Sequence, residues 1–168
     1  MMGADKGKMK VRIRPIRKED DRQLGAVIRS CFRDYGATEE GTVFSDPVID
    51  RLSLSFSNER SAYFVLEAGE EVVGGAGFQP LKGGDAAVCE LQKMYIRSDF
   101  RGKGWGRALL EKCMSEAALA GFRLCYLESL PELKDALKLY EAAGFSYIPS
   151  RMGNTGYYGC TLFMTKTL

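Results

Sequence analysis

Hydrophobic and polar positions along the chain follow two periods, and each period predicts its own kind of element. Residues 11–16 alternate apolar side chains with arginines, the period of two that is typical of a strand. Residues 18–36 place apolar side chains at helical spacing, with acidic residues first and a glycine last, which predicts a helix. A second short helix is expected within residues 45–57, where Asp46 can cap the first turn and Pro47 suits its first position.

The rest of the chain contains further strands and helices. Residues 61–80 form two apolar runs separated by a glycine turn at residues 68–70, which predicts a hairpin. Helical spacing predicts one helix directly after the glycines that end at residue 106, and another that begins at Pro131 and ends at Gly144. Later strands are expected at about residues 87–97, 122–130 and 157–166.

Taken in order, these elements predict a mixed α/β fold with the sequence β-α-α-β-β-β-α-β-α-β-β. A chain of 168 residues is long enough for one core and short for two. We therefore expect a flexible N-terminus at residues 1–10 and a single domain at residues 11–168.

The composition narrows the class of protein. Hydrophobic residues make up 45% of the chain and charged residues 27%, which is typical of a soluble globular protein. The net charge of +2 gives no reason to expect a nucleic-acid or membrane partner. A basic run near the N-terminus is followed at once by acidic residues, so it is interpreted as a solvated terminus and the outer face of a strand. No apolar run suits a signal peptide or a membrane span, and a cytoplasmic protein is expected.

Histidine and cysteine usage limits the chemistry. The chain has no histidine, which excludes Ser-His-Asp and Cys-His catalysis, the common zinc sites and histidine as a general base. Its five cysteines are scattered in apolar contexts without C-x-x-C spacing, so reduced core cysteines are expected and no metal site. Acid–base chemistry would use Glu, Asp, Tyr, Cys, Lys, water or the backbone.

The segment Ser98–Leu110 places three glycines at alternate positions, immediately before an apolar helical pattern. Free N–H groups at a helix start favour a phosphate or pyrophosphate, and Arg101, Lys103 and Arg107 add positive charge. The spacing matches neither a P-loop nor the dinucleotide-binding fingerprint. An ordinary glycine turn is the alternative, although one glycine would suffice for it.

The stretch ELQKMYIRSDFRGKGWGRALL, residues 90–110, resembles the central motif of the GCN5-related N-acetyltransferases, in which a strand leads into [Arg/Gln]-x-x-Gly-x-[Gly/Ala]. Arg101, Gly104 and Gly106 occupy the motif positions. The later stretch ALKLYEAAGF, residues 136–145, resembles a helix of the same family. The likeness covers the C-terminal two-thirds of the chain, and the N-terminal third matches only in its strand-helix-helix pattern.

This resemblance implies a mixed, mostly antiparallel sheet flanked by helices, with acetyl-coenzyme A as co-substrate. It implies that the glycine loop binds the coenzyme pyrophosphate and that backbone groups at the end of the preceding strand pair with the pantetheine arm. The implied cofactor-binding residues are Met94, Tyr95, Ile96, Arg101, Gly102, Lys103, Gly104, Trp105, Gly106 and Arg107. Many members carry an asparagine seven residues before the helix tyrosine, Tyr140 here, and Leu133 stands at that position. That contact with the pantetheine is missing or replaced.

Acetyl transfer to an amine needs a neutral nitrogen, a polarised thioester carbonyl and a proton for the departing thiolate. Family members often carry a glutamate at the position of Glu90, acting directly or through water as the general base; a structural or solvated strand carboxylate is the alternative. The resemblance makes Tyr140, beside the coenzyme sulfur, the candidate general acid, with aromatic packing as the alternative. A backbone N–H near Met94 would stabilise the oxyanion. Direct attack by the amine within a ternary complex is the expected mechanism.

The acceptor is expected to be a primary amine of a small molecule or a peptide. Phe32 and Tyr35 lie in the first helix, and Asn154 and Tyr157 lie in a polar and aromatic loop before the last strand. These four are candidate substrate-binding residues, with core packing or a glycine-rich turn as the alternatives.

Two other functions stay open at this point. A non-catalytic acyl-coenzyme A-binding sensor or regulatory module is compatible with Leu133 and with a structural Glu90. A nucleotide-phosphate binder would use the same glycine loop. Exposed edge strands suggest a homodimer as the assembly.

Overall fold

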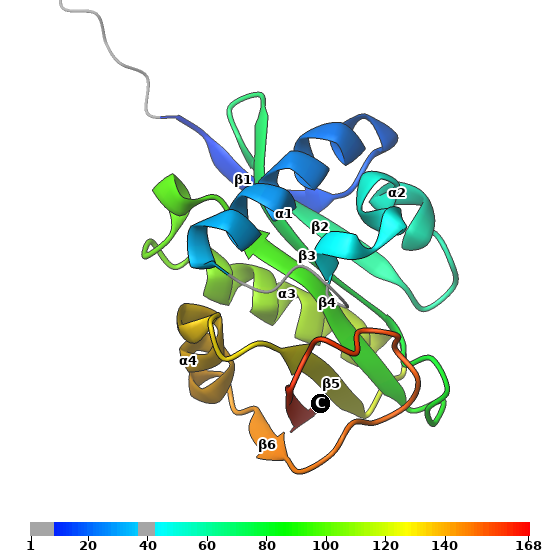
Figure 1. Cartoon of the computed structure of the whole chain (residues 1–168). Coiled ribbons are helices and arrows are strands. Elements are labelled where there is room, and N and C mark those ends of the chain that lie inside the picture. The colour runs from blue at the N-terminus through cyan, green and yellow to red at the C-terminus, as the bar shows by residue number, and fades with distance from the viewer. Residues whose placement is uncertain (1–8, 37–42) are drawn as a thin grey trace, which may run out of the picture.

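The computed structural model describes residues 9–36 and 43–168 (Figure 1). The expected flexible N-terminus, residues 1–10, lies almost entirely outside the described residues. The element order agrees with the one that the sequence predicts. The strands and helices are β1 Val11–Pro15, α1 Asp21–Tyr35, α2 Leu52–Ser55, β2 Ala62–Ala68, β3 Glu71–Pro80, β4 Val88–Ile96, α3 Trp105–Leu119, β5 Leu124–Ser129, α4 Lys134–Ala142, β6 Ser146–Ile148 and β7 Leu162–Thr167. Short 3₁₀ helices lie at Lys18–Asp20, Val43–Ser45, Pro47–Asp50 and Ser98–Phe100.

The strands form a seven-stranded sheet in the order β1-β2-β3-β4-β5-β7-β6. Every neighbouring pair is antiparallel except β4 and β5, which confirms the expected mixed, mostly antiparallel sheet. The parallel pairing covers only three residues of each strand, from Val88 opposite Leu124 to Glu90 opposite Tyr126. Beyond Glu90 the two strands continue without pairing to each other, so the sheet opens in its centre.

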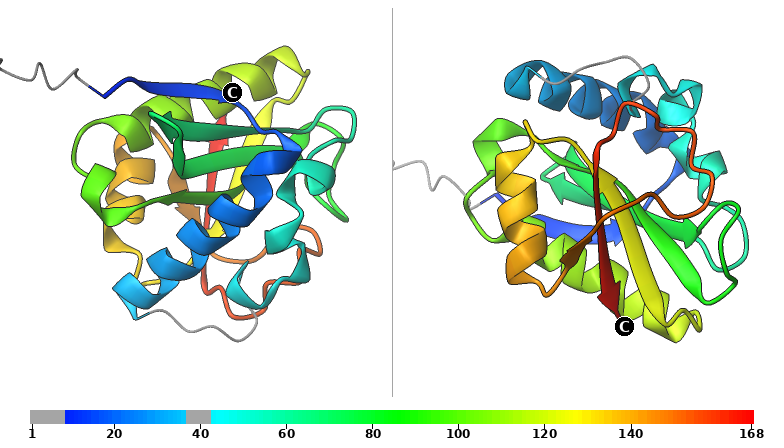
Figure 2. Two further views of the ribbon diagram at one scale, coloured as in Figure 1. Left: turned by 90° about the horizontal axis from the view of Figure 1, so that it is seen from above. Right: turned by 60° about the horizontal axis from the view of Figure 1, so that its bottom comes forward.

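Helices cover both faces of the sheet. Side chains of β2 alternate between two cores. Phe64 and Leu66 belong to the core that α3 and α4 cover, and Tyr63 and Val65 belong to the core beneath α1. Figure 2 shows α1 and α3 on opposite sides of the strands. β2 and most of β3 are therefore buried on both faces, which explains their nearly continuous apolar runs.

Two predicted helix boundaries need correction. The helix expected within residues 45–57 is split into the 3₁₀ turn Pro47–Asp50 and the single turn of α2. Asp46 does cap the first of these turns, because its carboxylate accepts the N–H of Val48.

The helix expected to begin at Pro131 begins at Lys134 instead. Leu133 has a non-helical backbone, with φ −82° and ψ 54°, and its side chain is buried in the core beneath α1. The buried position of this leucine therefore goes with a non-helical backbone, and the helix begins three residues after Pro131.

The glycines of β3 make room for an aromatic ring. A Cβ at Gly75 or at Gly77 would lie 2.5 Å from an atom of the Tyr63 ring, so the ring lies directly against bare backbone. The Tyr63 hydroxyl donates a hydrogen bond to the carbonyl of Lys93 at 2.7 Å. Lys93 lies in a β-bulge, where β4 has two residues opposite the single Ala76 of β3, and its φ is 54°. Tyr63 thus holds the bulge that directs the Lys93 side chain.

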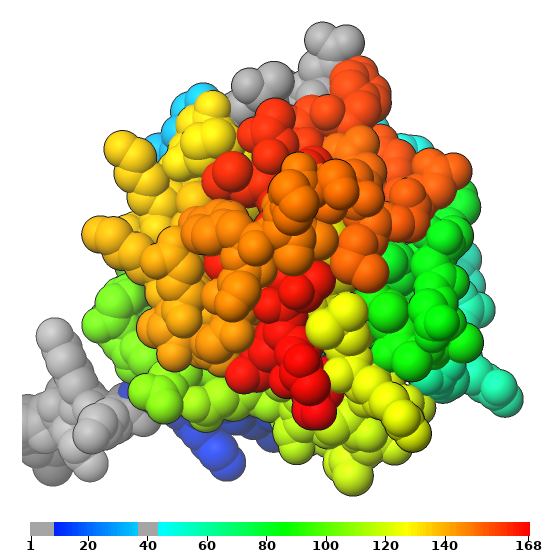
Figure 3. All heavy atoms as spheres, turned by 90° about the horizontal axis from the view of Figure 1, so that it is seen from below, coloured from blue at the N-terminus to red at the C-terminus, as the bar shows by residue number. Residues whose placement is uncertain are grey.

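The end of the chain covers the lower face of the molecule. β7 lies between β5 and β6, and residues 149–161 connect β6 to β7. Figure 3 shows this region, orange to red, across the centre of the face seen from below. The connecting segment carries Tyr157 back to the bulge of β4, where its hydroxyl accepts a hydrogen bond from Lys93.

We expect Gly75→Ala to lower the free energy of unfolding by about 2 kcal/mol, because the added methyl group overlaps the Tyr63 ring. Chemical denaturation measures the change. In a Tyr63→Val background the same substitution should cost at least about 1 kcal/mol less, because the ring that opposes it is gone. Equal costs in the two backgrounds would show that the ring and the glycine do not interact as described.

Candidate active site

A cavity of about 500 Å³ opens where β4 and β5 separate. Residues 90–96 of β4, residues 127–129 of β5 and the following Leu130 line it. Because β4 has no partner strand beyond Glu90 on this side, its backbone groups there are free of ladder hydrogen bonds. The volume lies within the roughly 300–1,000 Å³ of typical small-molecule sites.

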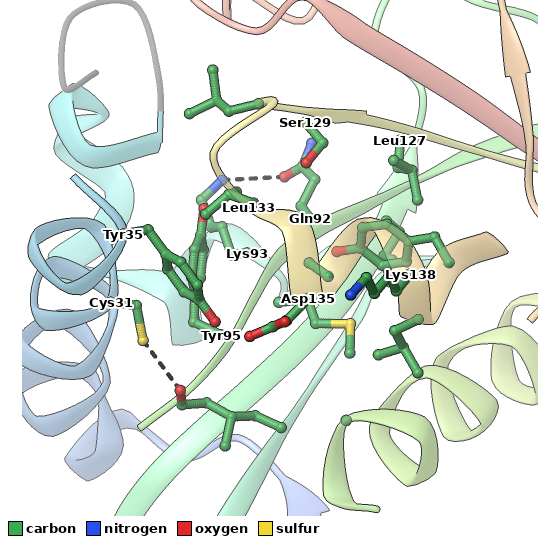
Figure 4. A pocket seen from close by; sticks show the side chains of 18 of the residues that line it. Cys31, Tyr35, Gln92, Lys93, Tyr95, Leu127, Ser129, Leu133, Asp135 and Lys138 are labelled. Atoms are coloured by element: carbon green, nitrogen blue, oxygen red, sulfur yellow. Dashed lines mark hydrogen bonds between the residues drawn. The ribbon is translucent and has the colours of Figure 1, made fainter. Parts of the chain in front are cut away.

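Helices from both halves of the chain flank this cavity (Figure 4). Cys31 and Tyr35 come from α1, and Asp135 and Lys138 come from α4. Among the described residues, the cavity therefore joins segments that lie more than a hundred positions apart in the sequence, from Cys31 to Asp135.

The glycine loop borders the same cavity at the start of α3. Gly102 and Gly104 have φ values of 71° and 87°, a region that favours glycine, and a Cβ at either would meet open space. Gly106 serves packing instead, because a Cβ there would lie 3.1 Å from Leu139 of α4. The first N–H groups of α3 face no capping side chain at Gly104, which leaves them available to an anion.

Arg101 braces the loop against α1. Its Nε donates to the carbonyl of Ile96 at 2.6 Å, and its guanidinium carbon lies 4.7 Å from the centre of the Tyr35 ring. A terminal nitrogen also lies 3.2 Å from Asp34. Cys31 donates to the same Ile96 carbonyl at 3.3 Å. The arginine therefore ties the end of β4 to the first helix, while its side chain still lines the cavity.

The other residues expected around the coenzyme divide into two groups. Met94, Tyr95, Ile96 and Arg107 line the cavity together with the three glycines. Lys103 and Trp105 do not: Lys103 donates to the Asp99 carbonyl, and Trp105 packs against the main core.

Tyr140 of α4 lines the cavity and is almost fully buried. Burial, followed by nearby cysteines, raises the pKa of its hydroxyl. The hydroxyl is therefore protonated at neutral pH, and the raised pKa makes it a weaker acid than an exposed tyrosine. Its ring also packs on Phe145, with the centroids 5.8 Å apart, so the residue contributes to the core as well as to the cavity wall.

Glu90 is the last residue of β4 that pairs with β5, and it is only 2% exposed. Burial raises its pKa to about 7, a hydrogen bond from Gln92 at 2.7 Å opposes that rise, and the nearby Glu128 adds to it. A carboxyl group with this pKa exchanges a proton near neutral pH, which is the property that a general base needs.

Lys93 is a site residue that sequence analysis missed. Its ammonium lies 2.7 Å from the Tyr157 hydroxyl, 3.2 Å from the Gln92 amide oxygen and 3.4 Å from Asp46. The Tyr157 hydroxyl in turn donates to Asp46 at 2.9 Å. Burial lowers the pKa of Lys93, while Asp46 and Glu90 oppose that effect. The strand pattern gave no signal for this residue, because its inward direction depends on the bulge.

Glu128 of β5 carries a second buried carboxylate. One oxygen accepts hydrogen bonds from Tyr126, Arg151 and Thr155 at 2.8 to 3.0 Å. The other oxygen is buried without a hydrogen-bond partner among the described residues. This carboxylate borders the main cavity and helps to raise the pKa of Glu90.

A second, smaller cavity of about 250 Å³ lies on the other side of the bulge. It shares Glu90, Gln92, Lys93 and Tyr157 with the main cavity, so these four side chains form the boundary between the two. Its remaining lining residues are Asp46, Val48, Ser55, Gln79, Pro80, Lys82 and Thr155.

The residues expected to contact the acceptor are dispersed. Tyr157 borders both cavities, and Phe32 and Tyr35 line the main one. Phe32 is almost fully buried and packs at 5.5 Å from the Tyr95 ring, so its role includes the core. Asn154 lines neither cavity: it is exposed, and its backbone N–H donates to the Lys82 carbonyl. Its position in the loop before β7 is as predicted, but the loop turns its side chain away from the site.

The described residues contain neither a cluster of metal-binding side chains nor a membrane-spanning helix. No group of three or more Cys, Asp or Glu side chains there has the arrangement of a metal site. Within residues 9–36 and 43–168, no helix combines the length and apolar character that crossing a bilayer requires.

Known sequences resemble this chain over most of its length. Residues 25–145 match the model of the acetyltransferase (GNAT) family. An uncharacterised N-acetyltransferase of Escherichia coli K12, YjgM, is 40% identical over 157 residues, which cover 93% of this chain and 94% of that protein. A probable N-acetyltransferase of Mus musculus, family 8 member 5, is 30% identical over 116 residues, covering 68% of this chain and 49% of its own.

Solved structures share the fold at lower identity. A GNAT-family acetyltransferase from Staphylococcus aureus Mu50 superposes with a TM-score of 0.79 at 16% identity, covering 95% of this chain and 99% of its own. A phosphinothricin acetyltransferase from Sinorhizobium meliloti, crystallised with acetyl-coenzyme A, gives 0.74 at 22% identity, with coverages of 95% and 89%. Sequence, fold and the glycine loop thus lead to one conclusion: the chain belongs to the GNAT family and is an acetyl-coenzyme A-dependent acetyltransferase.

Proposed function

We propose that this enzyme transfers the acetyl group of acetyl-coenzyme A to a primary amine of a small molecule or peptide, by direct attack within a ternary complex. The observation that carries this proposal is one cavity that brings together the glycine loop, the free edge of β4, Glu90 and Tyr140. These groups come from separate segments, and each supplies something different that the reaction needs.

The donor would lie along the opening between β4 and β5. Its pyrophosphate would bind the N–H groups at the start of α3, where Gly102 and Gly104 let the backbone turn. Its pantetheine arm would pair with Met94, Tyr95 and Ile96 along the edge of β4 that has no partner strand, where the Ile96 carbonyl already accepts from Arg101 and Cys31. Arg101 and Arg107 in the lining fit the negative charge of such a ligand, and acetyl-coenzyme A would supply the activated acyl group.

Leu133 occupies the position where many family members carry asparagine, so a side-chain amide contact is missing there. Leu133 lines the cavity and also packs in the core beneath α1. Ser129 and Asp135, which line the cavity nearby in the sequence, offer polar groups in its place.

The proposed proton transfers use two buried side chains with raised pKa values, Glu90 and Tyr140. The amine nitrogen bonds to the acyl carbon and loses one proton to Glu90, directly or through water. The carbon–sulfur bond breaks, and the departing thiolate takes one proton from Tyr140. Glu90 then returns its proton to solvent as Tyr140 regains one, so the balance closes on a free thiol and an amide. A backbone N–H near Met94 would stabilise the oxyanion.

We expect Glu90→Gln to lower kcat by about 10²- to 10⁴-fold, because the amide cannot accept the proton. For the wild type, kcat/KM should rise with pH up to about 7 and then level off, since Glu90 acts only when ionised. The pH profile is measured with two acceptors whose amine pKa values differ, because a rise caused by the acceptor's own titration would move with that pKa. The limb near pH 7 should stay fixed for both acceptors and vanish in the variant.

Coenzyme binding, measured by thermal shift with coenzyme A and with ATP, provides the control for Glu90→Gln. A variant that still binds coenzyme A but no longer turns over supports the assigned role. Protection by ATP but not by coenzyme A would instead indicate a nucleotide-binding protein. Unchanged turnover in the variant would show that Glu90 is a structural carboxylate.

We expect Tyr140→Phe to lower kcat by about 10²-fold or more, because the thiolate loses its proton donor. The substitution keeps the ring that packs on Phe145, so the unfolding temperature should change little. Steady-state kinetics on wild type and variant at saturating coenzyme provide the measurement. If the variant is less stable and its turnover per folded molecule is unchanged, Tyr140 contributes packing alone.

A further inference from the structure

None of the residues proposed above to bind the donor lines the smaller cavity beyond the β4 bulge. It reaches the main cavity only across Glu90, Gln92, Lys93 and Tyr157. An acceptor that attacks the thioester must approach Glu90 from a side that the coenzyme does not fill. The smaller cavity provides such an approach, and its lining therefore bears on what the acceptor is.

Two of the charged groups in this lining neutralise each other. Asp46 accepts hydrogen bonds from the Val48 N–H and the Tyr157 hydroxyl, and the Lys93 ammonium lies 3.4 Å from it. The three hydrogens of the Lys93 ammonium have three acceptors within reach, on Tyr157, Gln92 and Asp46. Neither Asp46 nor Lys93 is left as an unmatched charge for a ligand.

Two other charged groups form no salt bridge with any described residue, although Lys93 and Arg151 act on Glu90 from a greater distance and lower its pKa. Within the described part of the chain, the Glu90 carboxylate accepts one hydrogen bond, from neutral Gln92, and no ion pair or hydrogen bond engages the Lys82 ammonium. Glu90 is buried at the boundary with the main cavity, whereas Lys82 is exposed and borders only the smaller one. The cavity thus has a negative inner end and a positive outer end.

We propose that the smaller cavity is the acceptor site and that it takes a small amine carrying an acid group, such as an amino acid. The amine would lie inward at Glu90, and the carboxylate would lie outward at Lys82. This inference rests on the acetyltransferase function proposed above and specifies its acceptor.

Size and charge both disfavour the other classes of acceptor. The volume of about 250 Å³ is below the roughly 300–1,000 Å³ of sites for drug-sized ligands, which suits a molecule of amino-acid size. A polyamine would place a second cation near Lys82 and be repelled there. A peptide is larger than one amino acid and would extend beyond a cavity of this volume.

The test compares amino acids with their own amides and with alkylamines of the same carbon skeleton. The full chain is mixed with acetyl-coenzyme A and each acceptor, and the release of free thiol gives kcat/KM. We expect at least one amino acid to exceed its matched amide by about fivefold or more, the size of a charge-assisted contact that is partly exposed. A polyamine and a short peptide complete the panel.

Substitutions of Lys82 locate the effect in the smaller cavity. Lys82→Gln should reduce the ratio of kcat/KM for the amino acid to that for its amide towards one, and Lys82→Glu should bring it below one. Lys112→Gln removes a lysine on α3 that pairs with Glu116, and it should leave the ratio as in the wild type. A ratio that Lys82→Glu leaves unchanged would overturn the assignment of the outer end.

The outcomes separate this inference from the proposed function. Turnover of amides, alkylamines, a polyamine or the peptide at rates equal to or above those of the amino acids would refute the acceptor class and leave the N-acetyltransferase intact. No turnover with any amine, despite a thermal shift with coenzyme A, would refute both.

Discussion

The separation of β4 from β5 after three paired residues is the constraint on which the site depends. A parallel pair that continued to Ile96 would satisfy every backbone group of β4 and leave no space between the strands. Because the pairing stops at Glu90, the sheet keeps one stretch of extended backbone that is unpaired on one side but held on the other by β3. Arg101 and Cys31 fix the far end of that stretch by sharing the Ile96 carbonyl.

The bulge in β4 changes the face of the sheet on which the Lys93 side chain lies. Without it, side chains would continue to alternate strictly, and Lys93 would follow the pattern of its neighbours. Tyr63 holds the bulge through the Lys93 carbonyl, and it reaches that carbonyl only because Gly75 and Gly77 lack side chains. The glycines of β3 are thus a packing requirement of the site on the neighbouring strand, β4.

Local patterns in the sequence were sufficient for the order of the elements and for the glycine loop. Gly36, at the end of the first helix, and Gly102 and Gly104, in the glycine loop, all adopt the left-handed backbone that favours glycine. Features that depend on distant segments were not predictable in this way. The inward direction of the Lys93 side chain depends on a bulge in a strand that reads as regular in the sequence. The Asn154 side chain is exposed although it lies in the predicted loop. The last helix begins after Leu133, which packs beneath α1, and not at Pro131 as predicted. Each of these is decided by tertiary contacts, which no short window of sequence contains.

The hydrogen bond between Tyr157 and Asp46 joins residues 111 positions apart. It closes a large loop of chain around the smaller cavity, and the entropy of loop closure makes such contacts late to form and early to open. The walls around the donor belong to the central sheet and to the helices packed on it, whereas part of the wall around the smaller cavity belongs to two irregular segments joined by the Tyr157–Asp46 hydrogen bond. The two halves of the site therefore differ in local stability, so partial unfolding would dismantle one while the other persists.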